Sequence, residues 1–152
     1  MLVRKKDGGI RVCLDLRKVN TLTYKGIFPC PRLVNLVDTL AGATVFSTLD
    51  IKMAFHHVPL SEDSKPLTAF STSKGTYQFK RMGMGAKNSA ATFQRLINSI
   101  LEGIQIPGKA TTVHSYFDDV TVASFDMTEH IDVLDSVLQG LLKANLHLKA
   151  PK

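Results

Sequence analysis

Alternating and helically spaced hydrophobic positions divide the chain into short strands and two long amphipathic helices. Val45–Asp50 is rich in β-branched and aromatic residues, which favour a strand. Residues 111–117 and 120–124 are two further β-rich runs, separated only by Asp118 and Asp119. This pattern predicts a β-hairpin that carries two carboxylates at its tip.

Helical spacing dominates two segments of the second half. One helix is expected to begin at Asn88 or Ser89, which are good N-cap residues. Its expected inward residues, at helical spacing, are Phe93, Leu96, Ile97, Ile100 and Leu101. A second helix is expected after Asp126, which with Glu129 resembles a capping box that has Asp in place of Ser or Thr. Its expected inward residues are Ile131, Leu134, Val137, Leu138, Leu141 and Leu142.

The first half has shorter elements. A Gly-rich turn between residues 2–3 and 10–16 predicts a hairpin, and residues 76–79 predict a short strand after the Lys-Gly turn. Residues 33–40 have helical spacing. Strands and helices are therefore interleaved with at least one hairpin, which favours an α+β fold with helices packed on one face of an antiparallel sheet.

Length and composition fit one globular domain. The 152 residues are 44% hydrophobic and 21% charged, close to ordinary globular usage. No apolar run is long enough for a membrane-spanning helix, and the N-terminus lacks the apolar core of a signal peptide. We therefore expect no membrane partner. The two cysteines, Cys13 and Cys30, are expected to be small core residues in a reducing compartment.

Charge is distributed unevenly along the chain. The first 32 residues hold eight basic and two acidic residues, which accounts for the whole net charge of +6. Residues 118–135 contain six acids and no Lys or Arg. A basic end and an acidic site in one domain suit a polyanionic partner together with a bound cation. The alternative is a solvated charged face with no partner.

The carboxylates carry the candidate chemistry. Asp118 and Asp119 by themselves are compatible with a solvated turn, but Asp50 ends another apolar strand with no Gly or Pro directly after it. Three acids at the ends of two central strands could share two Mg²⁺ ions, which prefer oxygen ligands and keep positions open for substrate phosphates. Such a pair serves phosphoryl transfer. The spacing alone does not separate a polymerase from a nuclease.

The motifs resemble one enzyme family. Tyr116-Phe117-Asp118-Asp119 resembles the Tyr-X-Asp-Asp signature of reverse transcriptases. Further segments resemble the enzymes of Gypsy-type LTR retrotransposons in order and spacing: residues 3–20, 29–32, 46–57, 65–70, 91–98 and 144–149. The resemblance covers the whole chain.

The resemblance implies an α+β fold: a polymerase palm with a ferredoxin-like antiparallel sheet and packed helices, plus part of the fingers. It implies that residues 1–152 form a single reverse transcriptase domain fragment, with fingers at about 1–45 and 60–90, palm elsewhere, and no thumb. A longer parent polyprotein with thumb, RNase H and integrase is expected. The expected location is intracellular: cytoplasmic, within a virus-like particle, or nuclear.

The resemblance also implies residue roles. Asp50, Asp118 and Asp119 are the expected catalytic residues, and with the backbone carbonyl of Ile51 they are the expected ligands of two Mg²⁺ ions, or of Mn²⁺. Phe55 is the expected steric gate against a ribose 2′-OH. The expected dNTP-binding residues are Lys5 (or Lys6 beside it), Arg11, Met53, Ala54, Phe55 and Met84. The expected template and primer contacts are Arg17, Asn20, Phe93, Gln94, Arg95, Tyr116 and Phe117.

Several positions depart from the family pattern, among them Phe117 and residues 51–57. Gly83 and Ala90 replace prolines, which frees backbone near the expected nucleotide and template pocket, and Met84 replaces the usual Phe. The implied activity is RNA-directed DNA polymerisation, in which dNTPs are added to a primer 3′-OH on an RNA or DNA template. The alternatives are a truncated or co-opted fragment that only binds nucleic acid, and a metal-dependent nuclease. Dependence on dNTPs separates the polymerase from both.

Overall fold

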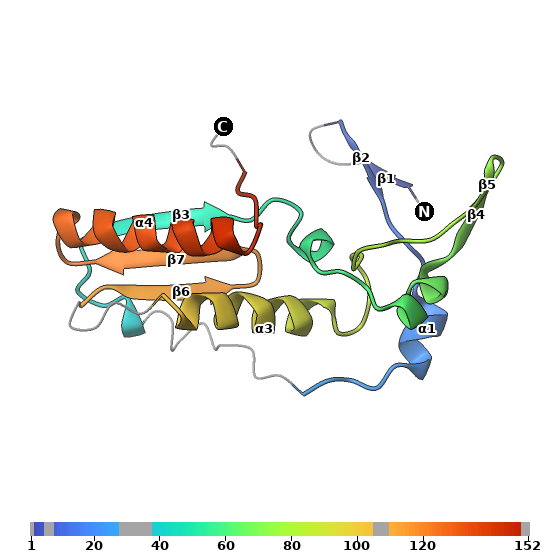
Figure 1. Cartoon of the computed structure of the whole chain (residues 1–152), viewed down its shortest axis with the longest axis horizontal. Coiled ribbons are helices and arrows are strands. Elements are labelled where there is room, and N and C mark those ends of the chain that lie inside the picture. Colours follow the sequence, from blue (N-terminus) through green and yellow to red (C-terminus); the bar gives the residue numbers. More distant parts are fainter. Residues whose placement is uncertain (1, 5–7, 28–37, 105–109, 150–152) are drawn as a thin grey trace. The chain divides into compact units, whose positions relative to one another are not determined.

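The protein divides into two compact units. The computed structural model (Figure 1) describes residues 2–4, 8–27, 38–104 and 110–149. The first unit comprises Met1–Ile27 and Phe55–Ala90, and the second comprises Phe28–Ala54 and Ala91–Lys152. The expected helix over residues 33–40 lies mostly outside the described residues, as do Lys5 and Cys30. The expected division into fingers and palm stays a prediction.

A three-stranded antiparallel sheet forms the centre of the second unit. Its strands are β3 (Val45–Asp50), β6 (Thr112–Tyr116) and β7 (Asp119–Ser124), in the order β3-β7-β6. The predicted strand and hairpin are thus confirmed. An antiparallel bridge between Ile51 and Leu148 adds a further backbone segment beside the end of β3. With helix α3 after β3 and helix α4 after β7, this is the expected ferredoxin-like arrangement.

Both helices cover the same face of this sheet. Ser47 of β3 and Ser115 of β6 pair with alternate residues of β7, so their side chains point to one face. His130 of α4 binds Ser47, and Gln94 of α3 binds Ser115. Figure 1 shows α3 and α4 running alongside the strands. Asp50 and Thr48 alternate with Ser47 along β3, so they point to the opposite face.

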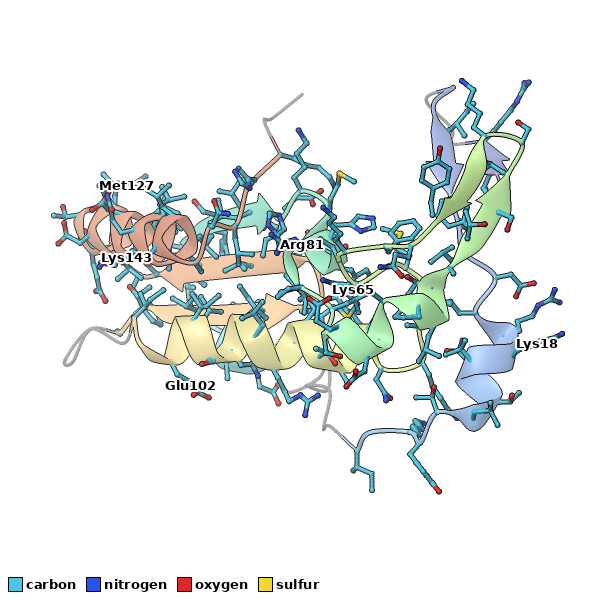
Figure 2. All side chains as sticks on the ribbon, turned by 45° about the vertical axis from the view of Figure 1, so that its right-hand side comes forward. Lys18, Lys65, Arg81, Glu102, Met127 and Lys143 are labelled. Atoms are coloured by element: carbon cyan, nitrogen blue, oxygen red, sulfur yellow. The ribbon has the colours of Figure 1, made fainter. Side chains whose placement is uncertain are left out.

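Helix α4 (Met127–Lys143) begins where the sequence predicts. Figure 2 labels both of its ends. Asp126 is the N-cap, and its Oδ2 accepts a hydrogen bond from the Glu129 backbone N at 3.0 Å. The Glu129 side chain does not complete a capping box. Its Oε1 instead accepts from the Thr111 N at 2.9 Å and from the Thr111 Oγ1 at 2.7 Å, which ties α4 to the residue before β6.

The buried stripe of α4 differs from the predicted one. Val137 and Leu141 are buried as predicted, and they share the inner face with His130 and Val133. The expectation of burial is wrong for Ile131, Leu138 and Leu142, which are 58%, 38% and 70% exposed. Apolar residues form two adjoining stripes along this helix, one buried and one exposed. The buried stripe is the one that contains His130, which makes hydrogen bonds with Ser47 and Ser124 of the sheet. No helix in the described part of the chain is long and apolar enough to cross a membrane.

Helix α3 (Ser89–Glu102) also begins at a predicted residue. Phe93 and Ile97 are fully buried as expected, whereas Leu96 faces solvent. The side chain of Asn88, which directly precedes the helix, accepts from the Gly26 N and donates to the Tyr24 O. Asn88 therefore ties two segments of the first unit together.

The first unit is built from short elements. The predicted hairpin is present, and the expected strand over 76–79 is placed one residue earlier and ends sooner. The elements are β1 (Leu2–Arg4), β2 (Ile10–Val12), α1 (Arg17–Leu22), β4 (Phe70–Thr72) and β5 (Gly75–Tyr77). Three 3₁₀ turns precede β4: η1 (Ala54–His57), η2 (Glu62–Ser64) and η3 (Pro66–Thr68). Helix α1 buries no residue, which explains why apolar spacing did not predict it.

Candidate active site

Three carboxylates meet at one end of the sheet in the second unit. Asp50 is the last residue of β3 and pairs directly with Asp119, the first residue of β7. Directly opposed residues have Cβ atoms about 4.5–5.5 Å apart. Asp118 lies in the β6–β7 turn, and its backbone O accepts a hydrogen bond from the Ile51 N at 2.9 Å. Backbone pairing therefore brings the end of β3 next to the β6–β7 turn, although the two are almost 70 residues apart in the sequence.

The carboxylates repel one another. Burial, together with the negative charges of Asp50 and Asp119, raises the pKa of Asp118, while the positive charge of Lys149 acts in the opposite direction. The Oδ1 atoms of Asp50 and Asp118 are buried, and neither has a hydrogen-bond partner among the described residues. Buried carboxylate oxygens without partners are unfavourable. This pair of oxygens fits a hard divalent cation such as Mg²⁺.

Lys149 supplies the positive charge at this site. Its Nζ donates a hydrogen bond to the Asp50 Oδ2, and its backbone N donates to the Asp50 O at 2.9 Å. No group of three or more His, Cys, Asp or Glu side chains in the described part of the chain is placed so that it could hold a metal ion. Mg²⁺ does not need three side chains, since it is commonly held by one or two carboxylates plus substrate phosphates. A cation at Asp50 would compete with the Lys149 ammonium.

Lys149→Met is expected to strengthen divalent-cation binding by about three- to tenfold. The substitution keeps most of the side-chain length but removes a charge that competes for Asp50 and repels a cation. The measurement is the Mg²⁺ concentration that gives half-maximal thermal stabilisation of the chain. Lys143→Met, at the end of α4, is the control. Equal Mg²⁺ midpoints in the Lys149 variant and the unsubstituted chain would contradict competition.

Asp118→Asn is expected to stabilise the metal-free protein at neutral pH. Because the pKa of Asp118 is raised above 3.8, its protonated form stabilises the fold, and this contribution is lost as the pH rises through the raised value. At pH 7 the charged form opposes folding. Solvent screens a partly exposed carboxylate, so we expect a gain of about 1 kcal/mol, or about 2–4 °C in melting temperature. The difference should shrink as the pH is lowered towards 3.8; a constant difference would refute this cause.

Unusual backbone geometry flanks the carboxylates. Met53 and Phe117 have φ angles of 53° and 54°, in the left-handed region that residues with side chains rarely adopt. In the described residues, the only other non-glycine residue of this kind is Asn145. Such conformations persist only when their surroundings hold them, and they cluster at functional sites. Phe117 directly precedes Asp118, so its conformation sets where that carboxylate points.

The residues expected to bind dNTP are divided between the two units. Arg11 on β2, Phe55 and Met84 belong to the first unit, whereas Met53 and Ala54 belong to the second. Ala54 is buried and Met53 is exposed. Lys5 lies outside the described residues. The expected role of all six in nucleotide binding stays a prediction.

Two residues expected to line the template path make contacts within the first unit. Arg17 is exposed and pairs with Asp15 at 2.7 Å, and this guanidinium holds the pKa of the Asp15 carboxyl at about 2. The Asn20 side chain donates to the Gly85 O and accepts from the Lys87 N, both at 2.8 Å. Asn20 thus fixes the loop that carries Met84.

The expected template and primer contacts of the second unit differ in exposure. Phe93 and Gln94 are 0% and 2% exposed, so their side chains are not available for direct template contact in this structure. Arg95 is exposed. The rings of Tyr116 and Phe117, the two residues before Asp118, are in edge-to-face contact with their centroids 4.6 Å apart. Sequence reasoning missed the structural role of Gln94, and it missed Lys149, which lies 99 residues from Asp50 and has no spacing signal.

Comparisons with known proteins identify the family of the chain. The family model described as "Reverse transcriptase (RNA-dependent DNA polymerase)" matches residues 3–152. The chain belongs to the reverse transcriptase family. The Pol polyprotein from transposon 297 of Drosophila melanogaster is 37% identical over 142 residues, which are 93% of this chain and 13% of that protein. The Pol polyprotein from Drosophila transposon gypsy is 34% identical over 93% of this chain and 13% of its own length. The resemblance to Gypsy-type retrotransposons is confirmed.

Solved structures of reverse transcriptases share the fold. The prototype foamy virus protease–reverse transcriptase superposes with a TM-score of 0.83 and 30% identity, covering 97% of this chain and 19% of that one. A foamy viral protease–reverse transcriptase in complex with double-stranded DNA gives a TM-score of 0.85 and 28% identity, covering 97% of this chain and 25% of that one. This chain therefore spans a small part of its longer reverse transcriptase relatives.

Proposed function

We propose that this chain carries the catalytic centre of an RNA-directed DNA polymerase, which adds dNTPs to a primer 3′-OH. The observation that carries the proposal is the meeting of Asp50, Asp118 and Asp119 at one sheet end, where two buried carboxylate oxygens have no hydrogen-bond partner among the described residues. Family membership supports the reaction type. The intended substrates are dNTPs and a primed RNA or DNA template.

The three carboxylates are proposed to hold two Mg²⁺ ions, or Mn²⁺, with the backbone carbonyl of Ile51 as a further ligand. When bound, two such ions activate an attacking oxygen and stabilise the leaving one. The chain itself contributes the negative charges of Asp50 and Asp119, which lie on paired strand ends. When no cation is present, the ammonium group of Lys149 offsets the negative charge of Asp50. The left-handed backbone conformation of Phe117 is proposed to orient the carboxylate of Asp118, the next residue in the turn.

The direction in which Asp50 and Asp119 point supports access by a nucleic acid. Asp50 and Asp119 pair directly and therefore point to the same face, opposite to the face covered by α3 and α4. Thr48, two residues before Asp50 on this face, is exposed. We propose that a primer end approaches the carboxylates from this side. Basic residues near the N-terminus supply charge for phosphate contacts that are independent of sequence.

The related proteins support the proposal that this chain is part of a polyprotein. The relatives are transposon polyproteins of which this chain covers between 11% and 14%. We therefore propose that thumb, RNase H and integrase segments accompany this chain in its parent. The proposed location is intracellular, as expected for a retroelement polymerase.

Primer extension on an RNA template tests the proposed function. The chain is incubated with a labelled DNA primer, Mg²⁺ and dNTPs, beside an Asp118→Asn, Asp119→Asn double variant. Extension that needs dNTPs and is lost in the double variant supports the polymerase. Shortening of the nucleic acid without dNTPs indicates a nuclease. Salt-sensitive template binding without extension in either protein indicates a binding fragment, and the last two results each overturn the proposal.

A further inference from the structure

Gln94 is a buried amide whose side chain lies between α3 and the hairpin that carries the carboxylates. Its Nε2 donates to the Ser115 Oγ at 2.7 Å, the Ser115 O at 3.2 Å and the Asn98 Oδ1 at 2.9 Å. The Ser115 Oγ in turn donates to the Asn98 Oδ1 at 2.9 Å. We call Gln94, Asn98 and Ser115 the amide clamp.

The other end of the Gln94 amide reaches the turn. Its Oε1 accepts a hydrogen bond from the Phe117 N at 2.9 Å. Phe117 has a φ of 54°, in the left-handed region that is unfavourable for a residue with a side chain. The next residue is Asp118. A single side chain therefore fixes the backbone donor directly before a carboxylate of the candidate active site.

The chemistry of the clamp requires an amide at this position. The Phe117 N and the Ser115 O demand an acceptor and a donor, respectively, which orients the Gln94 amide without ambiguity. A carboxylate would accept from Phe117 but would repel the Ser115 and Asn98 oxygens. An aliphatic side chain would remove the partner that Gln94 gives to the half-buried Phe117 N and to the buried Ser115 O.

We propose that Gln94 is a positioning residue for the metal-binding carboxylates: it holds Phe117 in the left-handed conformation and so aims Asp118. This inference deepens the proposed function and rests on it for its catalytic meaning. It replaces a template-binding role for Gln94 with a role inside the protein. Residues that orient metal ligands from outside the coordination sphere commonly change metal affinity by about 10–100-fold when substituted.

The test combines a structural and a metal-binding measurement on the full 152-residue chain. Gln94→Met keeps the volume and removes both polar ends. We expect the Phe117 amide to exchange its hydrogen at least about tenfold faster by NMR, and the affinity for Mn²⁺ alone to fall by about tenfold. Gln139→Met, an exposed position on α4, is the matched control and should change neither quantity. If Gln94→Met does not fold, Asn98→Ala removes one clamp partner and should shift both quantities in the same direction.

A purely structural role gives a different result. It lowers the melting temperature but leaves the Mn²⁺ affinity of the folded variant unchanged, and that outcome overturns the proposal. Failure of the polymerase proposal is separate: the unsubstituted chain would bind Mn²⁺ and respond to Gln94→Met without extending a primer. A chain that binds no Mn²⁺ at all would overturn the positioning role as well, even if Phe117 exchange still reported the clamp.

Discussion

Asp50→Asn is expected to lower the rate of templated primer extension by at least about 10³-fold. The substitution keeps the shape of the side chain but removes a charge at the point where β3 meets Asp119. Metal-assisted phosphoryl transfer gains several kcal/mol of transition-state stabilisation from its cations, and each 1.36 kcal/mol corresponds to a factor of ten in rate. The measurement is the rate of single-nucleotide addition at saturating dNTP and template.

The control for this effect is Asp135→Asn, which removes an exposed carboxylate on α4 away from the sheet end. We expect its extension rate to equal that of the unsubstituted chain. Loss of the Lys149 ion pair is an unavoidable side effect of Asp50→Asn. Lys149→Met isolates that effect, because it breaks the pair and keeps the carboxylate. An Asp50→Asn protein that retains more than about a tenth of the rate would contradict the assigned role of Asp50.

His130→Ala is expected to lower the free energy of unfolding by about 3 kcal/mol. His130 is buried on the inner face of α4, where its Nε2 bonds the Ser47 Oγ at 2.8 Å and its Nδ1 bonds the Ser124 Oγ at 2.9 Å. Truncation leaves a cavity and weakens two buried hydroxyl interactions at once. Unfolding in urea, followed by circular dichroism, gives the change in free energy.

The neighbouring position provides the contrast. Ile131 is larger and more apolar than alanine, yet it is exposed, so Ile131→Ala should change stability by no more than about 0.5 kcal/mol. A sequence-based assignment of the inner face predicts the reverse order of the two effects. Equal losses, or a larger loss for Ile131, would show that α4 is rotated relative to the structure described above.

The elements nearest the carboxylates could be predicted from the sequence because their signals are local. β3 has the predicted bounds, and the β6–β7 hairpin has its acids at the tip, since β-branched runs and a polar turn determine both. The N-cap of α4 could also be predicted from the sequence, because Asp126 accepts a hydrogen bond from a backbone N only three residues away. Features that depend on interactions between residues close in sequence can therefore be predicted from short sequence patterns.

The remaining features depend on contacts between distant segments. Two adjoining apolar stripes on α4 made its inner face ambiguous, and hydrogen bonds from His130 to Ser47 and Ser124 decided it. The family resemblance implied a template contact for Gln94, and its partners in β6 and the turn cannot be known from spacing. The Lys149–Asp50 pair joins the two chain segments that make up the second unit. Each of these required the tertiary structure.

Mn²⁺ binding to the metal-free chain, followed by electron paramagnetic resonance, tests the central claim most directly. The claim is that Asp50, Asp118 and Asp119 form the divalent-cation site of this chain. We predict saturable binding that is lost in the Asp118→Asn, Asp119→Asn double variant and retained in an Asp132→Asn, Asp135→Asn variant with the same loss of charge on α4. Binding that survives in the first variant, or that is lost equally in both, would contradict the site.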